Sequence, residues 1–258
     1  MSVIGIIPSR YGSTRLPGKP LALIAGKSLV RRVYEQARKC KTLDMVCVAT
    51  DDQRIVDEVK RIGGHAVMTS PNHPSGTDRI AETVTILEKD GITPPEIVVN
   101  IQGDMPFVDP RMIDELVEPM LADPSIPMGT SVYRIMCEED YHNPAVVKTV
   151  MDLNGFAMYF SRSLIPYPRM KTGIPVYDHL GIYVYRRDFL FTLAQLSPTP
   201  LEKEESLEQL RVLEHGYKIR VVKTACADAT FLGFAIDTPE DIKRAEEMLQ
   251  ERGIKDPE

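Results

Sequence analysis

Three cations lie close together in a loop near the start of the chain. Arg10, Arg15 and Lys19 follow the apolar run Val3–Ile7, and the first 34 residues contain no Asp or Glu. The run is typical of a buried strand, and open α/β sheets bind ligands beyond the carboxyl ends of their strands. Arg and Lys heads beside exposed backbone N–H groups suit phosphate. From the residues alone, a small anion site and a solvated basic loop both remain open.

Two aspartates further along the chain could hold a metal ion. Asp104 follows the predicted strand Glu96–Ile101, and Asp237 follows an apolar run and precedes a predicted helix over Thr238–Glu251. Two carboxylates from separate strand ends can bind Mg²⁺, which takes its other ligands from water and phosphate. Spacing alone leaves a second interpretation open for each aspartate: Asp104 as a turn or cap residue, and Asp237 as a residue that flanks a helix cap.

Several other kinds of site are disfavoured. The basic loop has neither the Gly-Lys-Ser/Thr ending of a Walker loop nor a G-x-G-x-x-G pattern, which argues against an NAD-dependent dehydrogenase. None of the five histidines pairs at i, i+4, so a zinc site is not expected. The four cysteines form no C-x-x-C pair and are expected to be reduced, mostly buried thiols of a cytoplasmic protein.

The bulk composition limits the partners of the protein. The 258 residues are 43% hydrophobic and carry a net charge of −6. An acidic chain without a long basic run is a poor candidate for a nucleic-acid or membrane-surface binder. No apolar run reaches the roughly 18 residues of a spanning helix, and the N-terminus does not resemble a signal peptide. We therefore expect no nucleic-acid partner and no membrane insertion. The other early cations, Lys27, Arg31 and Arg32, are expected in a loop and on an exposed helix face.

Apolar runs and amphipathic stretches alternate over the first part of the chain. Strands are predicted at Val3–Ile7, Met45–Thr50, His65–Thr69 and Glu96–Ile101, and helices at Ser28–Lys41, Gln53–Ile62 and Thr77–Asp90. This alternation predicts a mostly parallel sheet with helices on both faces. The basic loop and Asp104 would then meet at one edge of that sheet.

The second half is richer in predicted strands. A helix at Pro110–Met120 is followed by strands at Met128–Ile135, Ala145–Met151, Ala157–Ser161, Leu180–Tyr185 and Lys218–Thr224, with further helices at Asp188–Leu196, Glu204–Glu214 and Thr238–Glu251. We predict a single α/β domain over residues 1–258, with a mixed, mostly parallel central sheet flanked by helices. Its two halves would cover about residues 1–125 and 126–258.

Eight motifs in order along the chain resemble the 3-deoxy-manno-octulosonate cytidylyltransferase family. They are PSRYGSTRLPGKPL at 8–21, VATDD at 48–52, SGTDR at 75–79, NIQGD at 100–104, YFSR at 159–162, HLGIYVYR at 179–186, ESLEQLR at 205–211 and DTPED at 237–241. The resemblance implies a Rossmann-like nucleotidyltransferase fold with a smaller β-rich dimerisation part, and a homodimer. It also implies transfer of the cytidylyl group of CTP to an acidic keto-sugar, 3-deoxy-D-manno-octulosonate (KDO), for lipopolysaccharide biosynthesis.

The resemblance assigns roles to residues of the first half and to Asp237. Asp104 and Asp237 would bind Mg²⁺, and together with Arg10, Arg15 and Lys19 they would be the catalytic residues. The CTP site would comprise Pro8, Ser9, Arg10, Arg15, Lys19, Ser75, Gly76, Arg79 and Gln102. From the residues alone, Ser75 is equally a helix N-cap. Met105 stands where the family usually has Glu, which leaves the fine geometry beside Asp104 open.

The resemblance places the sugar site in the second half. It would comprise Arg162, His179, Glu205, Glu208 and Gln209. A guanidinium suits the carboxylate of an acidic sugar, and positions 205, 208 and 209 would share one face of the predicted helix Glu204–Glu214. From the residues alone, a surface salt bridge, a structural histidine and a solvated acidic face remain open.

Two further functions remain as alternatives. The same transfer could act on another acidic sugar, such as an 8-amino relative of KDO or a nonulosonic acid. The chain could also be a non-catalytic nucleotide-binding regulator with the same fold. The presence of both metal-site acids, Asp104 and Asp237, together with all three loop cations disfavours the regulator.

Overall fold

The computed structural model describes residues 1–13, 15–170, 172–226, 231 and 233–253. The chain divides into two compact units. We call Ser2–Pro95, Asn100–Pro110 and Asp228–Glu258 the N-terminal unit, and Met1, Glu96–Val99 and Arg111–Ala227 the central unit. The end of the chain therefore groups with its beginning. The single domain with a division near residue 125 stays a prediction.

The N-terminal unit contains a parallel set of strands in the order β1 (Val3–Pro8), β4 (Met45–Thr50) and β5 (His65–Met68). Ile6 pairs with Cys47, which in turn pairs with His65. Ile6, Ile7, Cys47 and Val48 are fully buried. Continuous apolar strands of this kind are expected where both faces of a parallel sheet are covered.

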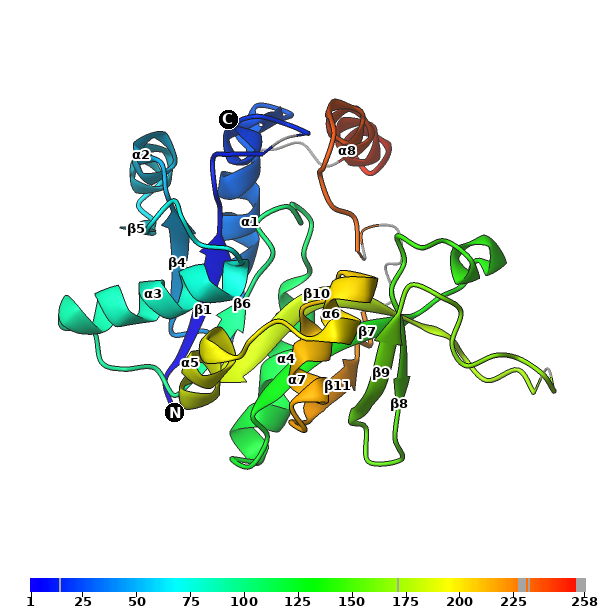
Figure 1. The fold of residues 1–258 in the computed structure, drawn as a ribbon. Coiled ribbons are helices and arrows are strands. Elements are labelled where there is room, and N and C mark those ends of the chain that lie inside the picture. Colours follow the sequence, from blue (N-terminus) through cyan, green and yellow to red (C-terminus); the bar gives the residue numbers. More distant parts are fainter. Residues whose placement is uncertain (14, 171, 227–230, 232, 254–258) are drawn as a thin grey trace. The chain divides into compact units, whose positions relative to one another are not determined.

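Helices α1 (Leu29–Ala37) and α2 (Gln53–Arg61) pack on β4, whereas α3 (Gly76–Lys89) lies across β1 and β4 (Figure 1). The last helix of this unit is α8 (Pro239–Glu251). The predicted N-cap Thr238 is confirmed, since its side chain accepts a hydrogen bond from the Asp241 N–H in a capping box. Each helix and strand predicted for this unit is present to within a few residues of its expected ends.

Short elements that were not predicted connect the basic loop to α1. They are a 3-10 turn η1 (Lys19–Leu21) and a hairpin of β2 (Leu23–Ile24) and β3 (Lys27–Ser28). The expectation that Arg32 lies on an exposed helix face is wrong. Its side chain is buried because the guanidinium donates two hydrogen bonds to the Ile24 carbonyl, at 2.9 and 2.5 Å. A buried arginine is tolerated where its donors find acceptors.

The central unit contains strands in the order β11-β7-β10-β6. They are β6 (Ile97–Asn100), β7 (Met128–Arg134), β10 (Tyr177–Arg186) and β11 (Ile219–Lys223). Strand β7 runs parallel to β11 and antiparallel to β10. A hairpin of β8 (Lys148–Met151) and β9 (Ala157–Ser161) branches from β10. The predicted α/β class with a mixed, mostly parallel sheet and flanking helices is confirmed.

The helices of the central unit are α4 (Pro110–Ala122), α5 (Arg187–Gln195), α6 (Pro200–Glu205) and α7 (Gln209–Glu214), with a 3-10 turn η2 (Glu138–Tyr141). The single helix predicted over Glu204–Glu214 is wrong. Ser206 has a left-handed backbone (φ 51°, ψ 50°), which ends α6 and lets the buried Leu207 donate its N–H to the Glu202 carbonyl. Among the described residues, no helix has the length and apolar character needed to cross a membrane.

Candidate active site

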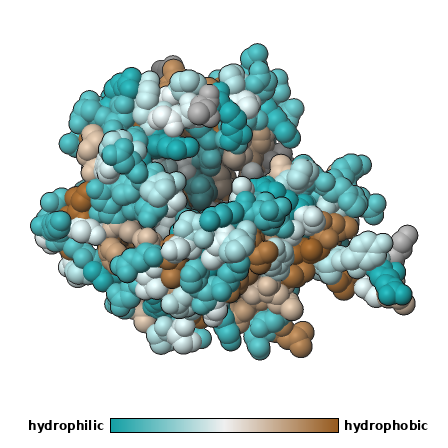
Figure 2. Space-filling view, in the orientation of Figure 1, coloured by the Kyte–Doolittle hydropathy of each residue, from teal (hydrophilic) through white to brown (hydrophobic). Residues whose placement is uncertain are grey.

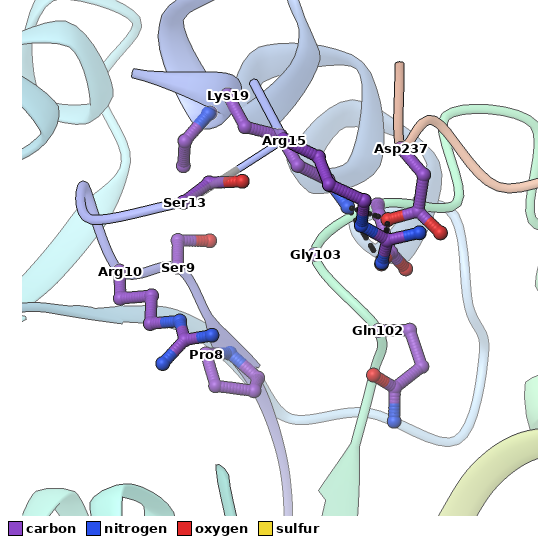
Figure 3. A pocket seen from close by; sticks show the side chains of 11 residues that line it. Pro8, Ser9, Arg10, Ser13, Arg15, Lys19, Gln102, Gly103 and Asp237 are labelled. Atoms are coloured by element: carbon purple, nitrogen blue, oxygen red, sulfur yellow. Dashed lines mark hydrogen bonds and ion pairs between the residues drawn. The ribbon is translucent and has the colours of Figure 1, made fainter. Parts of the chain in front are cut away.

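A cavity of about 250 Å³ lies beside the basic loop of the N-terminal unit (Figure 3). We call it the loop cavity. Its walls come from three stretches of sequence that are far apart: Pro8, Ser9, Arg10, Ser13, Arg15, Lys19 and Pro20; Gln102, Gly103 and Asp104; and Asp237. Every predicted catalytic residue lines this one cavity. Thr14 of the first motif, and Leu232 of the apolar run before Asp237, lie outside the described residues.

The turn that carries Asp104 lies directly against the end of β1. The Ile101 N–H donates to the Ile6 carbonyl at 2.9 Å, which fixes the chain beside the strand. A Cβ atom at Gly103 would lie 2.6 Å from the Pro8 carbonyl oxygen and 3.0 Å from the Ser9 hydroxyl. Only glycine permits so close an approach. The glycine of the QGD motif therefore places Asp104 next to the basic loop.

A cluster of opposite charges occupies the cavity wall. The Lys19 Nζ lies 2.9 Å from both Asp104 Oδ2 and Asp237 Oδ1, and an Arg15 terminal nitrogen lies 3.0 Å from Asp237 Oδ1. The Ile236 N–H donates to the Asp104 carbonyl at 2.9 Å and holds the two acidic segments together. Asp104 lies in a turn, and Asp237 directly precedes Thr238, the N-cap of α8, so both local positions fit the alternative interpretations as well. The ion pairs bring both carboxylates to a single cation.

Figure 3 shows how the remaining side chains surround this cluster. Arg15 points toward Asp237, whereas Arg10 and Gln102 lie on different sides of the cavity, away from that contact. Arg10 is an exposed side chain at the cavity rim. The cavity therefore has an ion-paired cluster at Asp237, with the Arg10 cation and the Gln102 amide on its other walls.

The two carboxylates fit a divalent cation. Both reach the same ammonium nitrogen within hydrogen-bonding distance, so their oxygens can converge on one small ion. Mg²⁺ is commonly bound by one or two carboxylates, with phosphate oxygens and water completing its octahedron. Asp104 and Asp237 are the residues that would hold it.

A second cavity, of about 260 Å³, lies at the N-terminus of α3. We call it the helix cavity. It shares Pro8, Arg10 and Gln102 with the loop cavity and adds His73, Pro74, Ser75, Gly76 and Arg79. The Ser75 hydroxyl accepts from the Asp78 N–H at 3.2 Å and so caps α3. Ser75 is therefore an N-cap that also lines the cavity, and its role in CTP binding stays a prediction.

His73 was not among the predicted site residues. It lines the helix cavity, and its Nε2 lies 2.6 Å from Glu82 Oε2, the same oxygen that accepts from the Ser70 N–H at 2.8 Å. The pKa of Glu82 is lowered: burial raises it, but the hydrogen bonds from His73 and Ser70 outweigh that effect. Only its position just before the SGTDR motif could have marked His73 in the sequence.

The predicted sugar residues belong to the central unit, where they form two groups. In the first group the Glu205 carboxylate accepts from the Ser161 hydroxyl at 2.6 Å and from the Arg162 N–H at 2.9 Å. The Arg162 guanidinium donates to the carbonyls of Glu205, Pro144 and Ser206 at 2.7, 2.8 and 3.3 Å. Arg162 therefore joins the end of β9 to the end of α6.

The second group contains His179 and Gln209. Strand β10 has a register shift between His179 and Tyr183, with Gly181 in a left-handed conformation (φ 68°) inside it. The Tyr183 hydroxyl donates to the Gln209 carboxamide oxygen at 3.1 Å. The His179 ring packs against the rings of both Phe160 and Tyr183, with ring centroids 5.0 and 5.3 Å away. The bulge thus brings the predicted histidine and glutamine to one place through Tyr183.

The protonation of His179 follows from its surroundings. The Thr130 hydroxyl donates its only proton to the Ile182 carbonyl at 2.8 Å, so at 2.9 Å it accepts from the His179 Nε2–H. Burial lowers the pKa of His179 to about 3, so the ring is neutral at pH 7. Its Nδ1 is consequently a hydrogen-bond acceptor.

Glu205, Glu208 and Gln209 do not share one helix face. Glu205 ends α6, Glu208 occupies the N-cap position of α7, and Gln209 begins α7. The predicted face is wrong because the left-handed Ser206 separates the two helices. Gln209 is buried rather than part of a solvated acidic surface.

Comparisons with known proteins show the family of the chain. A family model described as cytidylyltransferase matches residues 4–219. The chain is 47% identical to the 3-deoxy-manno-octulosonate cytidylyltransferase of Syntrophotalea carbinolica, over 97% of this chain and 99% of the relative. It is 46% identical to that of Fusobacterium nucleatum, over 99% of this chain and 100% of the relative.

Solved structures show the same fold. A CMP:2-keto-3-deoxy-manno-octonic acid synthetase complexed with CTP matches with a TM-score of 0.89 and 39% identity, over 98% of this chain and all of that one. A 4-diphosphocytidyl-2C-methyl-D-erythritol synthase of Anaerococcus prevotii matches with a TM-score of 0.62 and 13% identity, over 96% of each chain, which shows the fold alone.

Fold and site together define a nucleotidyltransferase: an α/β enzyme whose first loop and strand-end acids surround one cavity. With the comparisons, the chain belongs to the cytidylyltransferase family and, within it, to the 3-deoxy-manno-octulosonate cytidylyltransferases. The resemblance stated from the eight motifs is thereby confirmed.

Proposed function

We propose that this chain transfers the cytidylyl group of CTP to KDO, giving CMP-KDO and pyrophosphate. One observation carries the proposal: Arg15 and Lys19 of the first loop meet Asp104 and Asp237 in one cavity, next to a second cavity at the N-terminus of α3. A triphosphate needs cations and a metal site, and a nucleoside needs an adjoining pocket. The two cavities share residues, so one CTP molecule could occupy both.

The residues of the loop cavity have distinct tasks in this reaction. The anomeric oxygen of the sugar attacks the α-phosphorus in line, the bond from that phosphorus to the bridging oxygen breaks as pyrophosphate leaves, and the hydroxyl proton passes to water. Arg10, Arg15 and Lys19 bind the β- and γ-phosphates and stabilise the charge that develops on the leaving group. Lys19 and Arg15 are ion-paired to the carboxylates in this structure, so phosphate oxygens would compete for their donors. No covalent intermediate is required.

Asp104 and Asp237 would hold Mg²⁺, whose charge, when it is bound, stabilises the α-phosphate and the departing pyrophosphate. The carboxylates then have a second task. They offset the positive charge of Lys19 and Arg15 and keep both side chains directed into the cavity. Neutralising either aspartate would therefore disturb both the metal site and the phosphate site.

The helix cavity would bind the cytosine base and the ribose. Ser75, Gly76 and Gln102 line it, and a glutamine side chain offers both a donor and an acceptor to a base edge or a sugar hydroxyl. Gly76 places no side chain in the cavity, so the backbone of α3 can approach the ligand. His73 and Arg79 complete the walls.

The central unit would bind the sugar acid. Neutral His179 can accept a hydrogen bond from a sugar hydroxyl through Nδ1, and the Gln209 amide nitrogen is buried without a hydrogen-bond partner among the described residues. Arg162, Glu205 and Glu208 remain the other candidates for this site. An acidic sugar other than KDO would have to be distinguished by these residues, because the nucleotide site is common to both reactions.

We propose that the active form is a homodimer. Among the described residues of 136–174, six large hydrophobic side chains are at least 59% exposed: Met136, Leu153, Met158, Tyr167, Met170 and Ile174. Hydrophobic surface is visible in Figure 2 in the region where Figure 1 draws β8 and β9. Exposed apolar surface of this kind supports an interface with a second copy. Multi-angle light scattering should give a dimer, and Tyr167→Lys with Met170→Lys a monomer, whereas Leu121→Lys on α4 should change nothing.

The reaction would take place in the cytoplasm and supply CMP-KDO for lipopolysaccharide biosynthesis. All four cysteines are free thiols, and three of them are buried, as predicted. Free thiols are typical of a reducing compartment. Burial also raises the pKa of the Cys47 thiol to about 12, so this side chain is an inert part of the core.

A pyrophosphate-release assay with four nucleoside triphosphates and several acidic sugars tests the proposal. CTP with KDO should give the highest kcat/KM, with CMP-KDO identified by mass spectrometry. If the enzyme turned over another acidic sugar and not KDO, that sugar would be the substrate instead. CTP binding without turnover on any sugar would instead support a nucleotide-binding regulator.

A further inference from the structure

Asp51 belongs to neither the metal site nor the cavity walls, yet it contacts both sides of the nucleotide site. It follows β4 directly, and its side chain is only 13% exposed. Each of its two carboxylate oxygens is bonded to a different part of that site. The Tyr11 N–H of the basic loop donates to Oδ1 at 3.0 Å, and the Arg79 guanidinium of α3 donates to Oδ2 at 3.2 Å.

The Arg79 side chain is fixed from a second direction. It is 4% exposed, and its other terminal nitrogen donates to the Thr69 hydroxyl. The Thr69 hydroxyl in turn donates to the Thr50 carbonyl at 3.0 Å, at the end of β4. The guanidinium therefore bonds to the strand ends rather than projecting fully into the helix cavity that it lines. Its bond to Asp51 sets where the first turn of α3 lies.

Tyr11 determines the path of the basic loop. Its carbonyl accepts the Gly18 N–H at 3.2 Å and closes the loop just before Lys19. A Cβ at Gly18 would lie 3.1 to 3.2 Å from the Tyr11 ring and hydroxyl, so the ring packs against that glycine. The Arg54 guanidinium covers the ring at 3.6 Å from its centroid. Fixing the backbone of Tyr11 thus fixes the segment that carries Arg15 and leads to Lys19.

We propose that Asp51 is a positioning residue that couples the basic loop to the N-terminus of α3. The coupling keeps the distance between the triphosphate site and the nucleoside site at the value that one CTP molecule needs. The proposal rests on the proposed function. Carboxylate chemistry suits the task, because one small group accepts from a backbone N–H and from a charged guanidinium at the same time. An amide has one oxygen, so Asn at this position would have to turn an NH₂ toward one of the two donors.

The test compares Asp51→Asn with Asp44→Asn. Both aspartates flank β4, and Asp44 also accepts a backbone N–H, from Val3 at 2.8 Å, but at the opposite end of the strand. We expect Asp51→Asn to raise the KM for CTP about tenfold, since a hydrogen bond to a charged group is lost. The KM for the sugar should change less than about twofold, and Asp44→Asn should leave both KM values unchanged.

A double-mutant cycle separates coupling from a general loss of structure. If Asp51 positions α3 through Arg79, then Arg79→Gln and the double variant Asp51→Asn/Arg79→Gln should raise the KM for CTP by similar factors, well short of the product of the single effects. Asp51→Glu keeps both oxygens and should recover part of the CTP affinity. Thermal unfolding without ligand tests whether Asp51→Asn and Asp44→Asn lose similar stability.

Three outcomes would overturn the proposal: an unchanged KM for CTP in Asp51→Asn, equal increases in the KM values for CTP and sugar, or fully multiplicative effects in the cycle. Each of them presupposes that the wild-type enzyme releases pyrophosphate from CTP and KDO. Failure of the wild type itself would contradict the proposed function instead, so the two failures are distinguishable.

Discussion

In the N-terminal unit the predicted catalytic side chains of Lys19, Asp104 and Asp237 form ion pairs with one another, whereas in the central unit Arg162 and Glu205 bond mainly through backbone groups. Lys19 contacts two carboxylates from distant segments, and these contacts are side-chain ion pairs. Arg162 instead donates to three carbonyls, and Glu205 accepts from a backbone N–H and a serine. The first region is a preformed charge cluster that a charged ligand can reorganise. The second is a hydrogen-bonded frame that holds its shape without a ligand.

The difference has a physical basis. Ion pairs at partly exposed positions are weak and can exchange partners, which suits residues that must bind phosphate and metal. A guanidinium that donates to several carbonyls at once holds their segments together, and freeing it costs each of those hydrogen bonds. We therefore expect mutations in the N-terminal unit to act mainly on the reaction and those in the central unit to act also on stability.

The largest expected effect is on turnover, from Asp104→Asn. Removing one carboxylate charge should lower kcat on the order of 10³-fold, because it weakens electrostatic stabilisation of the transition state. Steady-state pyrophosphate release in saturating Mg²⁺ measures this. Asp57→Asn, an exposed acid of α2, is the control and should keep wild-type turnover. If Asp104→Asn kept near wild-type turnover, Asp104 would not be a ligand of the catalytic Mg²⁺.

Lys19→Met should have the next largest effect. The lysine lies between both metal-site carboxylates, and its loss removes a charge-assisted donor to the phosphates. The expected loss in kcat/KM for CTP is about 10²-fold. The exposed Lys39→Met serves as the control. If the two variants had the same kcat/KM, the loop cation would not contact the substrate.

Asp178 of the central unit should give a pH dependence of stability. It is buried on β10, and burial raises its pKa to about 6, against the hydrogen bonds from Tyr133, His179 and Val147. The folded protein then holds the proton more tightly than the unfolded chain, whose Asp pKa is near its usual value of ~3.9. The contribution of this group is therefore fully present below about pH 4 and is lost as pH rises through about 6.

Chemical denaturation of wild type and Asp178→Asn between pH 4.5 and 7.5 measures this effect. Relative to the variant, the wild type should lose about 2 kcal/mol of unfolding free energy over that range. The KM for CTP should stay unchanged in the variant, because Asp178 belongs to the central unit. A difference that is independent of pH would show that Asp178 does not titrate there.

Arg162→Lys is expected to have the smallest effect. A lysine cannot reach all three carbonyls, so the unfolding free energy should fall by about 1 kcal/mol, while the KM for CTP stays the same. Arg134→Lys, at an exposed position of β7, should have no effect. A large rise in the KM for the sugar without loss of stability would show that the Arg162 guanidinium binds the substrate and does not stabilise the protein through these carbonyls.

Sequence patterns predicted the regular elements well where the local signal was strong. The continuous run Met45–Thr50 is a strand with the predicted bounds, and Thr238 caps the last helix through its own side chain. The break in the predicted helix Glu204–Glu214 was missed because Ser206 carries no glycine-like signal for a left-handed backbone. The burial of Arg32 was missed because its acceptor, the Ile24 carbonyl, belongs to a short hairpin with no periodic pattern.

The sequence by itself determined the chemistry available to this chain: a basic first loop and two strand-end aspartates, in a family whose motifs run in order from residue 8 to residue 241. Those properties depend on residue types and on local periodicity, which the sequence records directly. Only the tertiary structure decided that Asp104 and Asp237 meet at Lys19, that Ser75 both caps α3 and lines a cavity, and that Asp51 joins loop and helix. These depend on distances of a few ångströms between segments far apart in sequence, which are fixed by packing and by close approaches such as that at Gly103.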